Sequence, residues 1–183
     1  MSYHYWQGEI IQLRAVEAQD IAFFETLDDE VNRNVDMLHF PTTKQNVVSW
    51  FESQQQRMFG DTFRFMAVNR AGEIVGTIDT FACNRRHGTF KYGITVGEAY
   101  RGQGYAQEMI RMVLRYYYEE LGYQKVTPHV YSFNTASIKL HETMGFVKEG
   151  QLRSMLYTNG QYVDEIYYGM TKEEFVSRYG DRN

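Results

Sequence analysis

The amino-acid sequence predicts one layered α/β domain with a mixed sheet. The first observation is that hydrophobic residues recur with a helical period over residues 17–54 and with a period of two over residues 63–96. The second is the order strand, glycine turn, helix, strand, helix and hairpin from residue 89 onward. The third is size: 183 residues, 43% of them hydrophobic, suit one compact core. No linker, repeat or low-complexity segment divides the chain, so we expect a single domain over residues 1–183.

A short strand and two helices are expected in the N-terminal part of the chain. Residues 10–15 alternate as a strand, and residues 17–28 carry apolar side chains at helical spacing. Thr42 or Thr43 caps the next helix. Residues 32–40, which lie between the two helices, are polar and irregular.

Strands dominate the middle of the chain. Residues 63–68 and 73–83 alternate and are joined by the turn residues 69–72, which predicts a hairpin. Residues 89–96 alternate as a further strand. The helix that follows a glycine-containing turn presents an apolar face of Met109, Ile110, Val113, Leu114 and Tyr117.

The C-terminal part predicts a strand, a helix and a final hairpin. Residues 126–131 read as the strand, and the helix runs from Asn134 to its terminating Gly145. The hairpin strands 152–158 and 161–170 flank Asn159-Gly160, a dipeptide that favours a type I′ turn.

Composition excludes several classes of protein. The single cysteine, Cys83, cannot form an internal disulfide, and no cysteine and histidine cluster has the spacing of a zinc site. The net charge is −4 with scattered basic residues, so the charge pattern of a nucleic-acid binder is missing. No apolar run approaches the roughly 20 residues that span a bilayer. We expect a cytoplasmic protein without metal, nucleic-acid or membrane partners.

The turn between strand 89–96 and the next helix has the features of a phosphate site. A helix start leaves several main-chain N–H groups unpaired, and the helix dipole adds about half a positive charge there. Gly102 and Gly104 let a diphosphate approach the main chain, and Arg101 adds a full positive charge. Gln107 stands where a dinucleotide-binding fingerprint has its third glycine, and no Gly-Lys-Ser/Thr sequence is present.

Two motifs carry a resemblance to a known family. Arg101-x-x-Gly104-x-Ala106 resembles the signature Q/R-x-x-G-x-G/A of the GNAT acetyltransferases, and the segment NTASIKLHETMGF over residues 134–146 resembles their second block. The hairpin around Asn159-Gly160 is similar to the branch of ribosomal-protein N-terminal acetyltransferases and spermidine N-acetyltransferases. The resemblance implies the GNAT fold, in which a mixed, mostly antiparallel central sheet has helices on both faces. Because an exposed sheet edge often pairs subunits in this branch, it also implies a homodimer.

The resemblance further implies acetyl-CoA as cofactor and a set of contacts to it. The pantetheine arm is expected along Ile94, Thr95 and Val96. Asn134 is expected near the thioester end with Ser137 close by, although Asn134 also suits a helix N-cap and Ser137 suits tight packing. The residues expected to bind the diphosphate are Arg101, Gly102, Gln103, Gly104, Tyr105, Ala106 and Gln107.

His141 stands where many relatives have a tyrosine that is proposed to protonate the departing thiolate. A histidine can donate a proton near neutral pH, and a histidine on a helix can equally be a packing residue. A thiol with a pKa of about 8.5 is a good leaving group without an acid. Both readings of His141 therefore stay open.

Direct transfer requires a neutral amine, and an oxyanion that a main-chain N–H such as that of Val96 stabilises. Holding a lysine-like amine neutral at pH 7 costs about 4 to 5 kcal/mol, against about 1.4 kcal/mol for a peptide α-amine. The candidate bases are Glu98 and Asp79, and the candidate contacts to a cationic acceptor are Glu30 and Asp36. Each of these acids can also be an ordinary surface charge.

The sequence thus favours an N-acetyltransferase that moves an acetyl group from acetyl-CoA to a primary amine, which is a polyamine, another small molecule or a peptide N-terminus. One alternative is a sensor that binds acyl-CoA without transferring the acyl group. Another is an unrelated α/β domain with a chance glycine turn, for which no stabilisation by CoA is expected.

Overall fold

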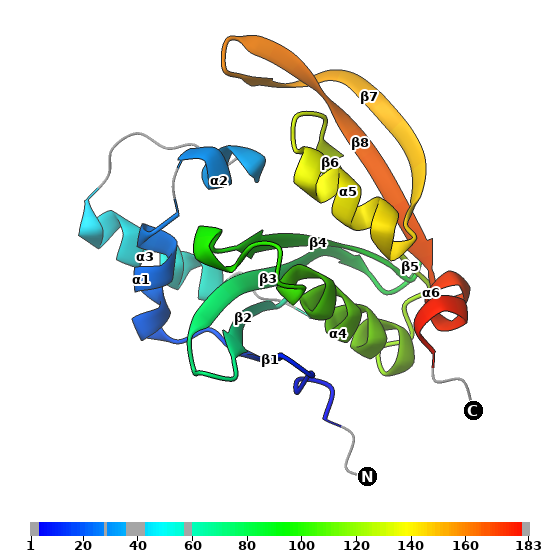
Figure 1. The fold of residues 1–183 in the computed structure, drawn as a ribbon, viewed down its shortest axis with the longest axis horizontal. Coiled ribbons are helices and arrows are strands. Elements are labelled where there is room, and N and C mark those ends of the chain that lie inside the picture. The colour runs from blue at the N-terminus through cyan, green and yellow to red at the C-terminus, as the bar shows by residue number, and fades with distance from the viewer. Residues whose placement is uncertain (1–3, 28, 36–42, 57–59, 181–183) are drawn as a thin grey trace. The chain divides into compact units, whose positions relative to one another are not determined.

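The computed structural model describes residues 4–27, 29–35, 43–56 and 60–180, which form two compact units (Figure 1). The first unit comprises Met1–Phe81 and Gly93–Met112, and the second Ala82–Tyr92 and Val113–Asn183. Three elements contribute residues to both units. They are strand β3 (Ile74–Asn84), strand β4 (Thr89–Val96) and helix α4 (Tyr105–Glu119).

The first unit contains the strands in the order β1-β2-β3-β4. Strand β1 (Ile11–Ala15) pairs antiparallel with β2 (Arg64–Asn69), and β2 pairs antiparallel with β3. The alternation in the sequence explains these strands, because Ile11 and Leu13 of β1 are buried while Gln12 between them is exposed. The Gly97 N–H donates to the Val75 carbonyl (2.9 Å) just beyond the end of β4.

Helices lie on both faces of this part of the sheet. A Cβ at Gly76 of β3 would meet the Met109 side chain of α4, whereas Arg64 of β2 lies over Phe24 and Trp50. Gly76 is three residues from Asp79, the register partner of Arg64, so the two helix groups cover opposite faces. The helices of this unit are η1 (Ala18–Asp20), α1 (Ile21–Glu25), α2 (Asp29–Asn34), α3 (Lys44–Gln56), η2 (Glu98–Tyr100) and the first half of α4.

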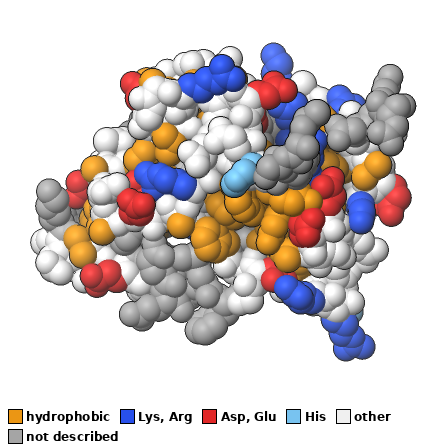
Figure 2. All heavy atoms as spheres, turned by 90° about the horizontal axis from the view of Figure 1, so that it is seen from below, with side chains coloured by type: hydrophobic (Ala, Val, Ile, Leu, Met, Phe, Trp, Pro, Cys, Tyr) orange, Lys and Arg blue, Asp and Glu red, His pale blue; other side chains and the backbone are white. Residues whose placement is uncertain are grey.

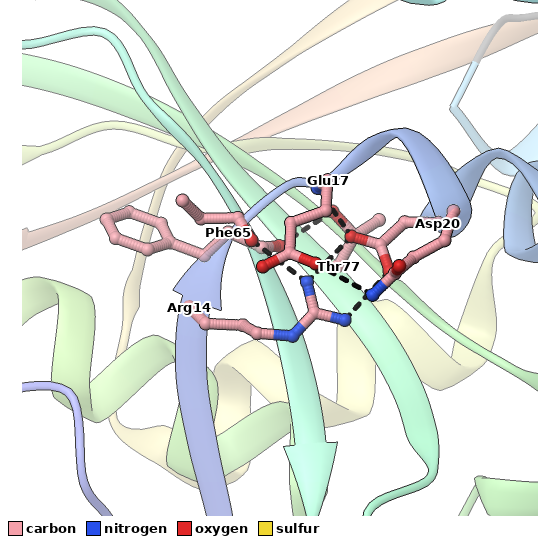
Figure 3. Close-up of polar contacts among 7 residues, drawn as sticks. Arg14, Glu17, Asp20, Phe65 and Thr77 are labelled. Atoms are coloured by element: carbon pink, nitrogen blue, oxygen red, sulfur yellow. Dashed lines mark hydrogen bonds and ion pairs between the residues drawn. The ribbon is translucent and has the colours of Figure 1, made fainter.

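An ion pair between Arg14 and Asp20 holds the connection from β1 to η1 in place (Figure 3). Arg14 donates from Nη1 and Nη2 to the two carboxylate oxygens of Asp20, each at 2.7 Å, and the Glu17 N–H donates to Asp20 as well. Burial would raise the pKa of Asp20, but the hydrogen bonds from Arg14 and Glu17 outweigh it and hold that pKa below its ordinary value. Asp20 is fully buried, so this pair serves structure.

The second unit has the strand order β4-β5-β8-β6, with β7 paired to β8. The pair β4·β5 is parallel, and β8 pairs antiparallel with β5, β6 and β7. Its remaining elements are β5 (Lys125–Val126), β6 (His129–Tyr131), α5 (Thr135–Met144), β7 (Val147–Thr158), β8 (Gln161–Thr171) and α6 (Lys172–Tyr179).

Aromatic residues build the core of the second unit. Phe90 stacks on Tyr117 with ring centroids 4.4 Å apart and meets Tyr123 edge to face. The buried Tyr118 hydroxyl donates to the Met170 carbonyl (2.6 Å), so this tyrosine joins α4 to β8. The high tyrosine content is thus explained in part by core packing.

Most of the expected elements are present, and the fold class is confirmed. The strand at 89–96 and the hairpin around residues 69–72 are as expected, and Asn159 and Gly160 have φ of 50° and 77°, as a type I′ turn requires. Thr43 caps α3, since its Oγ1 accepts from the Asn46 N–H (3.2 Å), while Thr42 lies outside the described residues.

Three expectations need correction. The strand expected at 126–131 is two short strands, because Pro128 between them has no N–H to donate to the sheet. The helix expected at 17–28 is the short pair η1 and α1. Residues 29–34, which overlap the segment expected to be irregular, form α2.

The surface of the described residues carries both acidic and basic side chains. On the face drawn in Figure 2, acidic and basic side chains are interspersed between hydrophobic ones. Among the residues that the structure describes, no helix is long and apolar enough to cross a membrane.

Candidate active site

Strand β4 presents an edge to the proposed cofactor. It is the last strand of the first unit, so its Gly93–Val96 half has β3 on one side only within that unit. A Cβ at Gly76 would clash with the Thr95 carbonyl oxygen, so a glycine is needed for β3 to approach β4 here. Ile94, Thr95 and Val96 are half-buried. Such an edge offers alternating N–H and C=O groups, which match the amides of a pantetheine arm.

The turn after β4 is open and rich in main-chain donors. Residues 101–104 are exposed, and Gly104 has φ of +86°, which side-chain-bearing residues rarely adopt. The Glu108 N–H reaches back to the Gly104 carbonyl (3.1 Å). The N–H groups before it belong to the first turn of α4, where no carbonyl four residues earlier is in helical position. They are therefore directed outward, as in a phosphate site.

Two side chains complete this turn. Arg101 is 42% exposed and lies 3.9 Å from Glu30 of α2, so its guanidinium remains accessible to an anion. Glu108 is buried and accepts from the N–H groups of Glu9 and Ile10, which fixes the N-terminal segment against α4. A cation, outward N–H groups and open space beside Gly102 fit the diphosphate of coenzyme A. The remaining expected contacts lie at the same helix start, with Gln103 exposed and Tyr105, Ala106 and Gln107 half-buried.

Asn134 and Ser137 lie at the start of α5 in the second unit. The Asn134 Oδ1 accepts from the Ser137 N–H (3.0 Å), so Asn134 is the N-cap of this helix. The Ser137 carbonyl accepts a hydrogen bond from His141 Nδ1 (2.7 Å). Both residues therefore have structural roles at the start of α5.

His141 is enclosed by hydrogen bonds in the second unit. A carbonyl can only accept, so Nδ1 carries the proton, and Nε2 then accepts from the Tyr92 hydroxyl (2.8 Å). The ring is 2% exposed and lies between Tyr92 and Tyr168. Burial lowers the pKa of His141 below its ordinary value, against the hydrogen bond to Ser137. A neutral, enclosed ring favours the packing reading over proton donation.

Replacing His141 with phenylalanine should lower stability far more than turnover. The Tyr92 hydroxyl, which is buried, would lose its acceptor, and an unsatisfied buried hydroxyl costs about 1–3 kcal/mol. The free energy of unfolding measured with urea checks the first part, and kcat from released CoA the second. A hundredfold fall in kcat with unchanged stability would instead support proton donation.

The same variant should weaken the pH dependence of stability. Because the pKa of His141 is lowered on folding, the unfolded chain binds the proton first, and the histidine destabilises the fold as pH falls below about 6.5. The phenylalanine variant lacks this contribution. His129, whose pKa burial and Lys91 also lower, keeps part of the dependence. Urea unfolding at pH 7.5 and 5.5 measures the difference between the two proteins.

The two candidate bases have different surroundings. Glu98 lies exposed on η2. Asp79 of β3 lies over β4, since a Cβ at Gly93 would be 3.1 Å from its Oδ1, and its side chain is 28% exposed. Burial raises the pKa of Asp79 above its ordinary value, although the charge of Arg64 opposes this. Of the two candidate bases, Asp79 is the one whose side chain lies against β4.

Sequence reasoning missed the residues around Asp79. Arg64 of β2 is its register partner, with Nη2 3.3 Å from Oδ2. The guanidinium lies 5.8 Å from the ring centroid of Phe24 in α1 and 6.0 Å from that of Trp50 in α3. The alternation of residues 63–68 was the one available signal, because it placed Arg64 opposite the apolar face.

Comparison with known proteins decides the family. The family model described as "Acetyltransferase (GNAT) domain" matches residues 11–147, which include β4, the glycine turn and α5. The chain belongs to the GNAT acetyltransferases. As a GNAT member it is an acetyl-CoA-dependent N-acetyltransferase, which confirms the function inferred from the two motifs.

Relatives of this GNAT chain include bacterial enzymes. It is 52% identical over 180 residues to the SPbeta prophage-derived uncharacterized N-acetyltransferase YokL of Bacillus subtilis (strain 168), covering 98% of this chain and 100% of that protein. It is 22% identical over 169 residues to the spermidine N(1)-acetyltransferase of Escherichia coli (strain K12), covering 92% and 90% of the two chains.

A solved structure supports the GNAT fold. The spermidine N-acetyltransferase of Vibrio cholerae, solved in complex with CoA and spermine, superposes with a TM-score of 0.80 at 22% identity. The match covers 91% of this chain and 98% of that chain.

Proposed function

We propose that this enzyme acetylates a primary amine that binds on the Asp79 face of the sheet, and that Asp79 is the general base. The observation that carries this proposal is the position of Asp79 over Gly93, next to the edge of β4 expected to bind the pantetheine arm. A base must lie within hydrogen-bond reach of the proton that it takes, directly or through one water, so the proposal places the acceptor nitrogen and the acyl group at the Gly93 end of the Gly93–Val96 segment.

Acetyl-CoA supplies an acyl group that is already activated as a thioester. Ile94 to Val96 hold its pantetheine arm through the main chain, and residues 101–107 bind its diphosphate. Coenzyme A is linear, so with its diphosphate at residues 101–107 the thioester lies at the other end of the arm, and a main-chain N–H at the Gly93–Ile94 end of the segment is the proposed donor to the acyl oxygen. Asn134 and Ser137 remain proposed contacts near the thioester. The proposed cofactor contacts are thus made by main-chain groups, by Arg101 and by residues at the start of α5.

Asp79 receives the proton that the acceptor must lose. A carboxyl group acts as a base only when ionised, so activity should rise with pH through the pKa of Asp79. Because burial raises that pKa, the carboxylate is a better proton acceptor than an exposed aspartate. Glu98 is then a surface acid beside the diphosphate turn.

Glu30 and Asp36 remain proposed contacts to the acceptor. Glu30 of α2 is 75% exposed in its side chain and has Arg101 as a neighbour, so its charge is partly balanced. Asp36 lies outside the described residues.

A screen of amines tests this function. The purified protein is incubated with acetyl-CoA and, in turn, polyamines, amino acids, amino-acid amides and short peptides, and the released thiol is measured. We expect release that depends on one class of amine. If acetyl-CoA raises the melting temperature but no amine causes release, the protein is a sensor and the proposal fails.

Three further proposals concern the whole molecule. Residues 1–183 act as a single domain, since the family match spans residues of both units. The dependence on acetyl-CoA and the single cysteine favour the cytoplasm.

A homodimer is supported by apolar side chains on the β7–β8 hairpin, where Met155, Tyr157 and Tyr162 are 53%, 62% and 68% exposed. Light scattering at several concentrations measures the assembly.

A further inference from the structure

The Asp79 face of the first unit carries a charge pair between aromatic rings. Arg64 and Asp79 are opposite each other on β2 and β3, and the Arg64 guanidinium lies over Phe24 and Trp50. The two rings meet edge to face, with centroids 5.8 Å apart. The side chains of Arg64 and Asp79 are 22% and 28% exposed, so both charges can be reached from solvent. Gly93, which has no side chain, lies beside Asp79.

This pair differs from the structural pair of the same unit. Arg14 and Asp20 make two parallel contacts of 2.7 Å, and Asp20 is fully buried (Figure 3). Arg64 and Asp79 instead approach through Nη2 and Oδ2 at 3.3 Å. A guanidinium has five N–H donors in a planar fork. Among the described residues, Asp79 is the one ion-pair partner of Arg64. Arg64 therefore keeps N–H donors that make no contact to a carboxylate, whereas Arg14 uses both of its terminal nitrogens to bind Asp20.

Arg64 also contacts the groups that would otherwise bind the ammonium group of a polyamine. A free ammonium ion is held by an unpaired carboxylate or by the face of an aromatic ring. Here the carboxylate of Asp79 is paired with Arg64, and the rings of Phe24 and Trp50 already face the Arg64 guanidinium. The site therefore presents one negative and one positive group side by side, and not a net negative charge.

We propose that Arg64 recognises a carboxylate on the acceptor, so that the preferred acceptors are α-amino acids and not polyamines. The inference rests on the proposed function, in which the acceptor binds on the Asp79 face. The ammonium group of an α-amino acid and its carboxylate are separated by one carbon. They complement an adjacent carboxylate and guanidinium, with nitrogen on Asp79 and carboxylate on Arg64. The flanking rings favour an apolar side chain.

Matched acceptors test the proposal. We compare kcat/KM for L-leucine and L-leucinamide, for L-phenylalanine and L-phenylalaninamide, and for spermidine, from the released thiol. The acid of each pair should exceed its amide by at least about tenfold, since a charged hydrogen bond to the fork is lost with the amide. At neutral pH a larger fraction of the amide is present as the neutral amine, because its amine is the less basic of the two. A preference for the acid therefore cannot come from the amount of neutral amine.

Two variants assign the preference to Arg64. Arg64→Gln should remove the acid-to-amide preference, chiefly through KM for the acid, while Arg64→Lys should keep part of it because it retains the charge without the fork. The matched control is Arg70→Gln. Arg70 is exposed in the turn that follows β2, so its loss should leave the acid-to-amide ratio unchanged. The wild-type ratio is informative even if a variant at position 64 does not fold.

The outcomes separate this inference from the proposed function. If no amine causes thiol release, the proposed function itself fails. If amines are acetylated but acid and amide react equally, or spermidine is preferred, the acceptor inference is overturned while the transferase proposal stands. A preference for the acid that persists in Arg64→Gln would place the recognition elsewhere and overturn it too.

Discussion

Replacing Asp79 with asparagine should lower kcat at least about 100-fold, because the amide cannot take the proton of the acceptor. The change keeps the size of the side chain and its place beside Gly93. Acetyl-CoA affinity should stay within about twofold, since the proposed cofactor contacts are main-chain groups of β4 and the turn after it. Thiol release under saturating acceptor gives kcat, and calorimetry gives the affinity.

Two comparisons sharpen this result. Glu98→Gln is the matched control, because it removes an exposed acid close to the cofactor strand and should change kcat less than about threefold. In wild type, kcat/KM should fall as pH decreases through the pKa of Asp79, which burial raises. Near-normal turnover in Asp79→Asn, or a collapse in Glu98→Gln, would contradict the choice of base.

Replacing Gly104 with valine should weaken acetyl-CoA binding at least about tenfold. The branched side chain would enter the space through which the diphosphate reaches the main-chain N–H groups of α4, and a tenfold loss corresponds to about 1.4 kcal/mol. A valine is also strained at φ of +86°. Calorimetry with acetyl-CoA measures the loss.

A matched glycine separates strain from obstruction. Gly122, which follows α4, has φ of +73° and no atom within 4 Å of an added Cβ. Gly122→Val thus carries similar backbone strain away from the proposed diphosphate site. Both variants should lower the melting temperature, but only Gly104→Val should lose affinity. Equal affinities for the two variants would argue against the phosphate-binding role of the turn.

Elements with a strong local pattern could be predicted. The strand at 89–96 alternates throughout, and Asn159-Gly160 dictates its turn because glycine and asparagine tolerate positive φ. Helix α6 was missed although Thr171 and Glu174 form a capping box, a signal visible in the sequence. Helix α2 has one buried residue, Val31, so it leaves almost no periodic pattern to detect.

The cofactor part and the acceptor part of the site differ in how far the sequence reveals them. The glycine turn is continuous in the chain, and its chemistry comes from main-chain N–H groups at a helix start, so about ten residues determine it. The role of His141 was left open by the sequence, because its partner Tyr92 is 49 residues away and only folding brings the two together.

The sequence by itself determined the fold class and the family, and it predicted the diphosphate turn, because period, turn residues and the helix start are local properties of the chain. Only the tertiary structure decided that Asp79 of β3 lies against Gly93 of β4 and that Arg64 accompanies it beside two aromatic rings. Phe24, Trp50, Arg64, Asp79 and Gly93 come from two helices and three strands. Strand pairing and helix packing set the distances between such residues, and no local pattern records them.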